Sequence, residues 1–478
     1  MNAAIVRVTA RLTRYRRLIA ALATSRDIQE FALRFLPILA KLGLALPAAY
    51  LIHRTIHPFS GAPARYRVLI IKKAVFNEDV LEVLGKAPDI EVFGVGRAVI
   101  KSLSLGILPR AVCDDATYVS DDPATEQAKV RYRTLCLRVW RYLSLFRQYD
   151  AVITGNWCYW AERELAAALE ELGTPFIVLH KEGIKPPERS RMLRDLFRKT
   201  RGRFAGRRVL VYHELERDHQ IEGDISRADQ ITIVGMPRLD RLHAWRKLAA
   251  SGKVPARSAR PMVLLLAFIP NNFLPSYSGI DSDLAWDELC RGTYRAALRL
   301  ACENPKIDVV IRPRLHELAE VAALLDREGP RPANVRVVAD GEIMPLIEAC
   351  WVVCGHNTTV LLEGLAAGKP VVVPHFGEAL DTRYHGYTVE HGEAVEHANS
   401  VDDLVSRVAR HCASPEPVRE ELRPAVLAEL EKWTGNADGR ASERVRSALM
   451  QELAGSGRGN GRANMIPAAA GRESRSTG

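Results

Sequence analysis

Short apolar runs, each ending in polar or glycine residues, recur along the chain from residue 66. The first half contains YRVLIIKK (66–73), IEVFGVG (90–96), DAVITGN (150–156), TPFIVLHKEG (174–183), RVLVYHELE (208–216) and QITIVGMPRLD (230–240). Apolar runs without strict polar alternation predict strands that are buried on both faces, as in parallel sheets. Helical spacing between them, as in AERELAAALEELG at 161–173, predicts strand–helix–strand units.

The same pattern resumes after a stretch of small, basic and proline residues at 249–260, which predicts a linker. Five further strands are expected, at 261–270, 307–314, 334–340, 349–356 and 370–376. The sequence therefore predicts an α/β protein with two Rossmann-like doubly wound domains, at 61–248 and 261–412, that face each other across a cleft. Helical segments follow at 413–454, and residues 455–478 have the composition of a disordered tail.

Charge is concentrated at the N-terminus. The chain of 478 residues has a formal net charge of +10, and residues 1–73 hold thirteen Lys and Arg residues against Asp27 and Glu30. Such an excess at one end favours an anionic membrane surface or an acidic lipid-linked partner over a nucleic-acid groove, and no nucleic-acid-binding motif is present. The eight cysteines form no CxxC pair and no zinc spacing, which favours reduced thiols in a cytosol.

Residues 1–60 are expected to form a basic, partly apolar helical segment. Between residues 5 and 19, apolar residues alternate with five arginines, a pattern typical of a helix that lies on anionic lipid. Residues 35–52 are nearly long enough to span a bilayer, but Lys41, Pro37 and Pro47 interrupt them. Three interpretations are open: surface association with a membrane, a helical hairpin packed on the first domain, or a true span.

The most informative stretch is VVCGHNTTVLLEGLAAGKPVVVPHF, in which a strand breaks at a glycine and a hydroxyl-rich turn opens a helix. The start of such a helix aims free N–H groups at phosphate oxygens, and a glutamate one turn further can accept hydrogen bonds from a ribose. The candidate donor-binding residues here are Gly355, Asn357, Thr358, Thr359 and Glu363. A structural interpretation is equally open, in which the glycine ends a strand, a threonine caps and the glutamate is solvated.

This segment resembles the donor-nucleotide motif of glycosyltransferases with the GT-B architecture. Over most of 66–450 the chain is similar to bacterial capsule and surface-polysaccharide biosynthesis proteins. The likeness is carried by Gly355, Thr358, Thr359, Glu363, Gly368, Lys369 and Pro370. It implies a nucleotide-activated donor in the second domain, an acceptor in the first, and a return of residues 413–454 onto the first domain. It also implies metal-independent chemistry, and the chain has no DxD-like acidic pair in a metal context; no cofactor is expected.

Two further loops offer groups to the donor. The loop VVIRPRLHE brings together Arg312, Arg314 and His316, and guanidinium groups match the paired oxygens of a pyrophosphate. The relatives usually carry Lys/Arg-Pro-His-Pro here, so this chain departs from their pattern, and a salt-bridged surface loop is the alternative. The loop PHFGEALD offers Glu378 and Asp381 to sugar hydroxyls, with a plain loop as the alternative.

The loop HKEG is expected to supply the catalytic base, because it follows a strand whose carboxyl end faces the expected cleft. An inverting transferase needs a group that takes the proton of the acceptor hydroxyl, and Glu182 is the first candidate and His180 the second. A packed loop with a structural ion pair is the alternative. Nine basic residues between 189 and 208, against Asp195 alone, suit a lipid-linked pyrophosphate or a membrane, or form a solvated helix.

These features predict a metal-independent GT-B-type glycosyltransferase, cytoplasmic and peripheral on the inner membrane. It would move a sugar or a polyol phosphate from a nucleotide-activated donor to a surface polysaccharide or a lipid-linked acceptor. One alternative is a nucleotide-sugar epimerase of the same architecture, which the basic N-terminus disfavours. Another is a catalytically silent binding subunit of a polysaccharide assembly complex, which the altered Arg-Pro-Arg-Leu turn keeps open.

Overall fold

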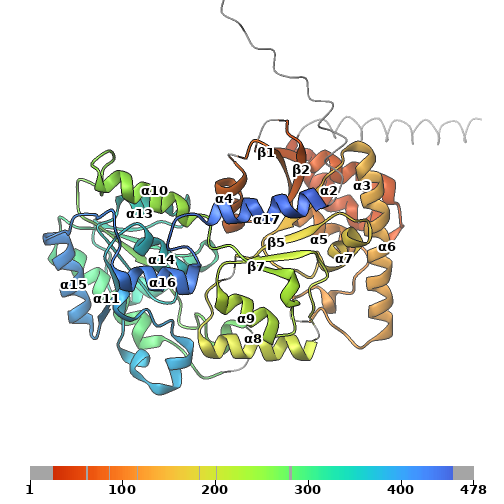
Figure 1. Ribbon diagram of the computed structural model, residues 1–478. Helices are drawn as coiled ribbons and strands as arrows, with labels where there is room; N and C mark the ends of the chain where they lie inside the picture. Colours follow the sequence, from red (N-terminus) through yellow and green to blue (C-terminus); the bar gives the residue numbers. More distant parts are fainter. Residues whose placement is uncertain are drawn as a thin grey trace, which may run out of the picture.

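The computed structural model describes residues 25–60, 63–85, 87–115, 117–181, 183–200, 202–278 and 282–455. Within these ranges the chain forms two α/β domains, each built on its own sheet and placed side by side (Figure 1). The prediction of two Rossmann-like domains is confirmed.

The first domain contains a seven-stranded sheet with the order β1-β3-β2-β4-β5-β6-β7. All neighbours pair in parallel except β1, which pairs antiparallel with β3 at one edge. The strand order reverses between β2 and β4, and doubly wound sheets bind ligands beyond the carboxyl ends at such a point. The strands are β1 (His57–Ser60), β2 (Tyr66–Lys72), β3 (Ile90–Gly96), β4 (Ala151–Thr154), β5 (Phe176–Leu179), β6 (Arg208–Val211) and β7 (Ile231–Ile233).

The second domain contains a six-stranded parallel sheet with the order β10-β9-β8-β11-β12-β13. This is the doubly wound order 3-2-1-4-5-6, whose reversal lies between β8 and β11. The donor-like motif therefore begins on the strand at the reversal. The strands are β8 (Met262–Leu266), β9 (Asp308–Arg312), β10 (Val335–Val337), β11 (Val352–Gly355), β12 (Val371–Pro374) and β13 (Glu396–Ala398).

Helices cover both faces of each sheet, which explains the continuous apolar runs in the sequence. In β2, Leu69 and Ile71 face one core while Val68 and Ile70 face another. The first-domain helices are α2 (Ser25–Lys41), α3 (Ala45–Thr55), α4 (Ala74–Leu84), α5 (Arg97–Leu105), η1 (Arg110–Val112), α6 (Pro123–Phe146), α7 (Arg163–Glu171), α8 (Pro187–Thr200), α9 (Glu214–Glu222) and η2 (Ala228–Gln230).

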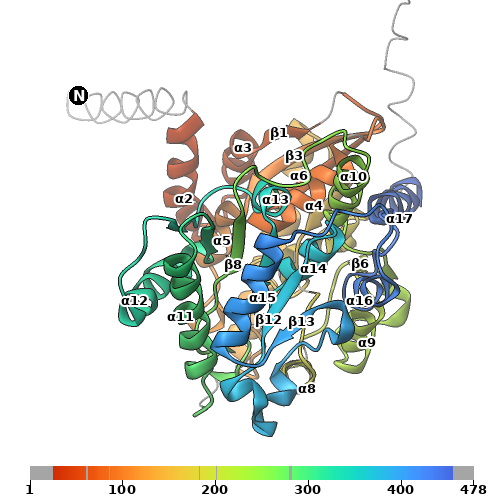
Figure 2. The same cartoon turned by 90° about the vertical axis from the view of Figure 1, so that its left-hand side faces the viewer.

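In the second domain, α11, α12 and α15 pack on one face of the sheet, and α10, α13, α14 and α16 pack on the other (Figure 2). The elements of this domain are α10 (Leu239–Ala250), η3 (Pro275–Ser278), α11 (Asp287–Glu303), η4 (Leu315–Glu317), α12 (Leu318–Glu328), α13 (Met344–Ala349), α14 (Thr359–Ala366), η5 (Gly377–Leu380), η6 (Thr382–Tyr387), η7 (Gly392–Ala394), α15 (Val401–Ala413) and α16 (Pro424–Thr434), and α17 (Ala441–Gly455) follows them in the chain.

Residues 25–55 form a helical hairpin that packs on the first domain. Leu36, Ala40 and Ala48 on its inner side join the core beneath α5 and α6. Of the three interpretations for the N-terminal segment, the packed hairpin describes these residues, and no helix within the described ranges is long and apolar enough to cross a membrane. The alternating stretch at 5–19 and the tail from residue 456 lie outside the described residues.

The chain passes between the domains at two turns that touch each other. Gly235 and Gly435 both have a positive φ, 83° and 56°, and a Cβ on Gly235 would lie 2.5 Å from the carbonyl oxygen of Gly435. Asn436 Nδ2 donates to the carbonyl oxygen of Met236 (2.8 Å) and to Asp240 Oδ1 (2.7 Å). Since only glycine tolerates this close approach at positive φ, both turns require it.

The first crossing precedes α10, so the boundary differs from the one predicted at residue 248. Leu239, Leu242 and Trp245 of α10 share a core with α14 in the second domain. The linker-like composition at 249–260 belongs to an exposed connection within that domain, whereas the passage itself is a tight turn. The second crossing leads into α17, which returns to the first domain and packs beside α4 (Figure 1).

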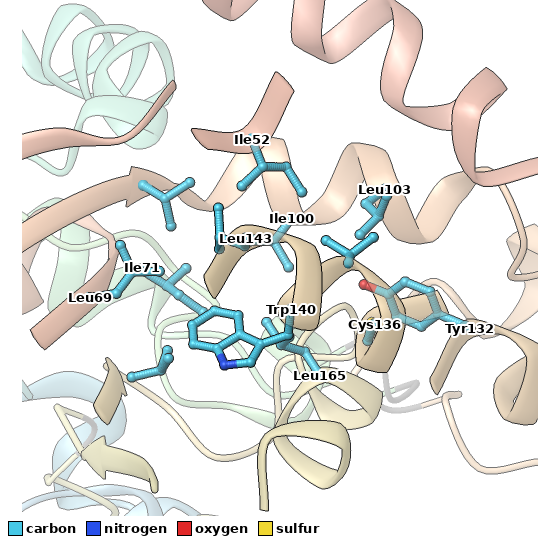
Figure 3. Close-up of a pocket in the computed structure, with 13 residues that line it drawn as sticks. Ile52, Leu69, Ile71, Ile100, Leu103, Tyr132, Cys136, Trp140, Leu143 and Leu165 are labelled. Atoms are coloured by element: carbon cyan, nitrogen blue, oxygen red, sulfur yellow. The ribbon is translucent and has the colours of Figure 1, made fainter. Parts of the chain in front are cut away.

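The core of the first domain encloses a cavity of about 30 Å³ between the sheet and its helices (Figure 3). Tyr132 and Trp140 line it, but their polar atoms donate elsewhere, to the carbonyl oxygen of Ala161 (3.1 Å) and to Thr174 Oγ1 (3.3 Å). A space of this size with an apolar lining stays dry. It is a packing feature rather than a ligand site.

Candidate functional site

The turn after β11 lies at the reversal of the second sheet. A Cβ on Gly355 would lie 2.8 Å from Cβ of Leu266, so glycine is needed there for close packing of β11 on β8. Thr358 is the N-cap of α14, with Oγ1 accepting from the backbone N–H of Val360 (3.4 Å), and Thr359 is the first helical residue. Both threonines are half-buried. Thr358 therefore caps the helix, which both interpretations of this turn allow, and anion binding here stays a prediction.

Asn357 shapes a neighbouring loop instead of capping the helix. It adopts φ 46°, its Nδ2 donates to the carbonyl oxygen of Tyr387 (2.8 Å), and its Oδ1 accepts from the backbone N–H of Val389 (2.8 Å). Asparagine is one of the few residues that tolerate a left-handed conformation. Its side chain therefore ties the donor-like turn to the loop after η6.

His356, between these residues, is buried against the rings of Trp286 (4.9 Å) and Phe268 (5.3 Å). Neither of its ring nitrogens has a hydrogen-bond partner among the residues that the structure describes. Burial lowers the pKa of His356 to about 3, so the ring is neutral. Buried polar atoms normally have partners, so this turn contains hydrogen-bonding capacity that the described protein does not use.

Glu363 is almost completely buried, with a side chain that is 3% exposed, and it carries a second unused group. Its Oε1 accepts from Nε of Arg238 at 3.0 Å, while its Oε2 has no hydrogen-bond partner in the described ranges. Burial raises the pKa of Glu363, and Arg238 opposes that shift. The glutamate is therefore not the solvated helix residue of the structural alternative.

Arg238 connects Glu363 to the first domain. Its Nη1 lies 3.2 Å from a carboxylate oxygen of Asp79, on α4, and Tyr212 Oη donates to the same carboxylate at 2.6 Å. Asp79 and Tyr212 are fully buried. One guanidinium thus pairs with a carboxylate from each domain, directly beside the first crossing.

Arg238 and Asp79 are not among the residues that the sequence motifs indicate. Arg238 lies in the turn GMPRLD, where only the glycine and the proline attract attention, and Asp79 lies in the helical stretch AVFNEDVLEVL. The sequence gives only a weak indication of Arg238, namely a single arginine at the start of a helix. Their pairing cannot be seen in the sequence because 159 residues separate them.

Glu78 places a third carboxyl group in this neighbourhood. Burial raises the pKa of Glu78, and the charge of Glu363 raises it further. Burial lowers the pKa of Arg312, and the charges of Asp340 and Glu78 oppose that shift. Glu78, Glu363 and Arg312 are therefore close enough to influence one another across the domain junction.

The end of β9 and the loop that follows it have an inner part, which contains Arg312, and an outer part, which contains Arg314 and His316. Arg312 donates to the backbone carbonyl oxygens of Val338 (2.9 Å), Asp340 (2.7 Å) and Gly341 (2.5 Å), so it holds the loop after β10. Arg314 Nη1 donates to Glu317 Oε1 at 2.9 Å, and His316 is 68% exposed with Nε2 3.7 Å from the same oxygen. The outer part matches the salt-bridged alternative, and pyrophosphate binding by this loop stays a prediction.

Glu378 and Asp381 are both engaged in local structure. Glu378 accepts from the backbone N–H groups of Glu288 and Leu289, both at 2.8 Å, and so caps the start of α11. Asp381 accepts from the backbone N–H of Arg383 at 2.9 Å and pairs with its guanidinium at 2.7 Å. Their binding to a sugar stays a prediction.

Of the two candidate bases, Glu182 lies outside the described residues and His180 is buried at the end of β5. His180 Nε2 lies 3.0 Å from Glu216 Oε1, and Lys185 pairs with the other oxygen of this glutamate. Burial acts to raise the pKa of Glu216, but Lys185 and His180 outweigh it and hold that pKa well below its usual range. His180 therefore faces an ionised carboxylate, an arrangement that can orient an imidazole.

Within the part of the chain that the structure describes, no group of three His, Cys, Asp or Glu side chains is placed to hold a metal ion. The groups that can meet phosphate charge are the start of α14 and the arginines near it.

No protein family model matches the chain, and no curated protein matches it in sequence. Similar solved structures include UDP-GlcNAc 2-epimerase from Neisseria meningitidis bound to UDP-GlcNAc, at 15% identity over 80% of this chain and 100% of that chain, with a TM-score of 0.45. The UDP-GlcNAc 2-epimerase from Methanocaldococcus jannaschii has 10% identity over 81% and 99%, with a TM-score of 0.46. An α,α-trehalose-phosphate synthase (UDP-forming) from Burkholderia vietnamiensis has 13% identity over 82% and 100%, with a TM-score of 0.42. Likeness of this degree assigns no function.

Replacing Arg238 with Met should lower the free energy of unfolding by about 3–5 kcal/mol, because two buried carboxylates lose their partner. Equilibrium urea unfolding measures the change. Arg241→Met is the matched control: it lies one turn further along α10, is 48% exposed and makes only long contacts of 3.6 and 3.8 Å. It should cost less than about 1 kcal/mol. Equal effects of the two substitutions would contradict a central role for Arg238.

Acid should destabilise the protein between pH 6.5 and 5, because several buried histidines are held neutral. Burial lowers the pKa of His213 to about 4, and burial and Lys185 lower that of His219 to about 3, as burial does for His356. The unfolded chain takes up these protons below pH 6.5 and the folded one does not, so stability falls by roughly 1.4 kcal/mol per pH unit for each histidine.

Urea midpoints measured at half-unit steps between pH 7.5 and 5 test this dependence. The variant His219→Gln, which keeps a hydrogen-bonding group near Ser190 Oγ (2.9 Å in the native chain), should flatten the slope. A slope that His219→Gln leaves unchanged would contradict a neutral His219 in the folded state.

Proposed function

We propose that this protein binds a nucleotide-activated sugar and transfers the sugar, or a polyol phosphate, to a surface polysaccharide or lipid-linked acceptor. The observation that carries the proposal is Glu363 Oε2, a buried carboxylate oxygen without a partner in the described chain, one turn into a helix whose start suits a diphosphate. The donor-like motif also lies at the reversal of a doubly wound sheet, where such folds bind ligands.

The two carboxyl oxygens of Glu363 have different partners in this proposal. Oε1 accepts from Arg238, which fixes the orientation of the carboxyl group. Oε2 accepts from a ribose hydroxyl, and the diphosphate lies at the start of α14, where the helix dipole favours negative charge. The unused ring nitrogens of His356 lie in the same turn.

The acceptor and the base belong to the first domain in this proposal. The acceptor hydroxyl oxygen forms a bond to the anomeric carbon while the bond from that carbon to the diphosphate oxygen breaks, and the hydroxyl proton passes to the base. His180 can take it on Nδ1, which has no hydrogen-bond partner in the described residues, while its Nε2 lies 3.0 Å from Glu216 Oε1. Glu182, beside it in the sequence, stays the other candidate. The reaction would take place at the cytosolic face of the inner membrane.

Glu363→Gln should weaken binding of the correct donor by tenfold or more, because the ribose loses a charged acceptor worth about 1.4 kcal/mol or more. Isothermal calorimetry with UDP-, CDP-, GDP- and CMP-linked sugars identifies the donor and measures the change. Glu393→Gln, at an exposed position of the same domain, is the control and should bind normally.

Asp79→Asn separates donor contact from domain geometry, since it weakens the Arg238 pair without touching Glu363. It should leave donor affinity within about threefold. If no nucleotide sugar binds the native chain, or if folded Glu363→Gln binds as well as the native chain, the donor assignment is wrong. Donor binding without transfer or donor turnover would favour the silent subunit.

A nucleotide-sugar epimerase is the second candidate, favoured by Glu78. An epimerase needs acidic and basic groups around the sugar, and Glu78 has a raised pKa beside Glu363 and Arg312. The two candidates differ in their products: the epimerase changes the donor with no acceptor present, and the transferase releases nucleotide only when sugar is transferred. NMR of the nucleotide sugar after incubation without acceptor distinguishes them, and Glu78→Gln should stop epimer formation.

A further inference from the structure

The end of the first domain that lies away from the second domain exposes large apolar side chains. It is built from the turn between α2 and α3, the end of α5 and the end of α6, which lie together at the right of Figure 1. We call this surface the apolar tip. Its side chains are between 40% and 76% exposed: Ile38, Leu42, Leu44, Leu46, Tyr50, Leu105, Leu145 and Phe146. Contiguous apolar surface of this kind usually marks an interaction site.

Packing makes the tip one continuous and rigid surface. The ring of Phe146 lies 5.8 Å from that of Tyr50 and 5.2 Å from that of His53, which joins α6 to α3. A Cβ on Gly106 would lie 2.3 Å from the carbonyl oxygen of Pro37, which shows how closely the end of α5 meets α2. The opposite side of the hairpin is anchored in the core.

The helices that build the tip contain no acidic residue over most of their length. No Asp or Glu occurs at 31–77, at 92–113 or at 127–149, which include most of α2, all of α3 and α5, and most of α6. Exposed cations lie on the same helices, with Lys41 at the end of α2 and Arg138 and Arg141 on α6. Burial lowers the pKa of His53, and the nearby Arg147 and Arg54 lower it further, so positive charge gathers around Phe146.

We infer that the apolar tip inserts into the surface of an anionic lipid bilayer, with leucine side chains among the acyl chains and the surrounding cations at the headgroups. An apolar surface that is bordered by Lys and Arg residues matches both the acyl-chain region and the anionic headgroup region of such a bilayer. The inference rests on the proposed function only in placing the protein at a membrane. It adds the surface that would hold the enzyme there.

Charge argues against a second copy of the chain as the occupant. A symmetric dimer through the tip would bring the same cations of two chains face to face, with no acid to pair with them. An anionic bilayer instead pairs with them, and the sequence before α2 contains five further arginines at 7–17. One occupant thus accounts for both the apolar side chains and the charge.

Flotation with lipid vesicles tests the inference on the full chain. We expect binding to phosphatidylcholine vesicles containing 30% phosphatidylglycerol, weak binding to pure phosphatidylcholine, and a loss of at least tenfold in bound fraction for the double variant Leu42→Asp/Leu46→Asp. The matched control is Leu215→Asp/Leu248→Asp, at positions 46% and 41% exposed on α9 and α10, and it should bind as the native chain does. Circular dichroism checks that both variants fold.

Two further variants separate the contributions of charge and of the N-terminal arginines. Arg138→Gln/Arg141→Gln should weaken binding to anionic vesicles and reduce its salt dependence. Replacing Arg7, Arg11, Arg14, Arg16 and Arg17 with Gln should leave part of the vesicle binding intact. Adding Leu42→Asp/Leu46→Asp to that variant should abolish the remaining binding.

Undiminished vesicle binding by folded Leu42→Asp/Leu46→Asp would overturn the inference. So would concentration-dependent self-association of the native chain that this variant abolishes, because a second copy would then cover the tip. Donor calorimetry on the same variant should be unchanged, so a failure of lipid docking and a failure of donor binding are distinguishable.

Discussion

The arrangement of the two domains depends on one buried guanidinium. Arg238 pairs with Asp79 of the first domain and Glu363 of the second, and all three side chains are nearly inaccessible to solvent. Burying charges costs several kcal/mol for each ion, and the attraction offsets that cost only when the geometry is good and the remaining lone pairs are bonded. Tyr212 supplies such a bond to Asp79, whereas Oε2 of Glu363 has none within the described chain. The network is thus complete on the first-domain side and incomplete on the side of the donor-like motif.

The position of Arg238 explains how a single residue acquires this role. It follows the turn at which the chain first crosses between the domains, and it begins α10, which packs on α14. The second crossing touches the first through Gly235 and Gly435, and Asn436 bonds across them. Both crossings therefore lie near Arg238 and its partner Glu363, at the place where the two domains are joined.

The strands and the two-domain plan are predictable from the sequence because buried parallel strands leave continuous apolar runs. The strands β1 and β13 are not, since His57–Ser60 and Glu396–Ala398 are short, polar edge strands without such a run. The crossing was misplaced for a physical reason: exposed loops and domain passages share the same small and polar composition, and here the passage is a glycine turn.

Site residues were predictable as motifs but not as contacts. Lys369 shows the difference: it carries the resemblance to donor motifs, yet its ammonium donates to the carbonyl oxygens of Ala256, Glu348 and Cys350 and joins three segments of the second domain. Arg312 likewise donates to the backbone carbonyl oxygens of Val338 and Asp340. A cation in a sequence motif has several acceptors within reach, and only the folded chain selects among them.

The pairing of Glu363 with Arg238 bears directly on what the glutamate can do. A carboxyl group buried without a partner would bind a proton at neutral pH, and one of its oxygens would then be a donor instead of an acceptor. Burial does raise the pKa of Glu363, and the guanidinium at 3.0 Å opposes that shift by favouring the charged form. The cation that opposes the shift comes from the domain crossing, where Arg238 also pairs with Asp79 of the first domain. One side chain therefore contacts both the domain junction and the carboxyl group of the proposed donor site.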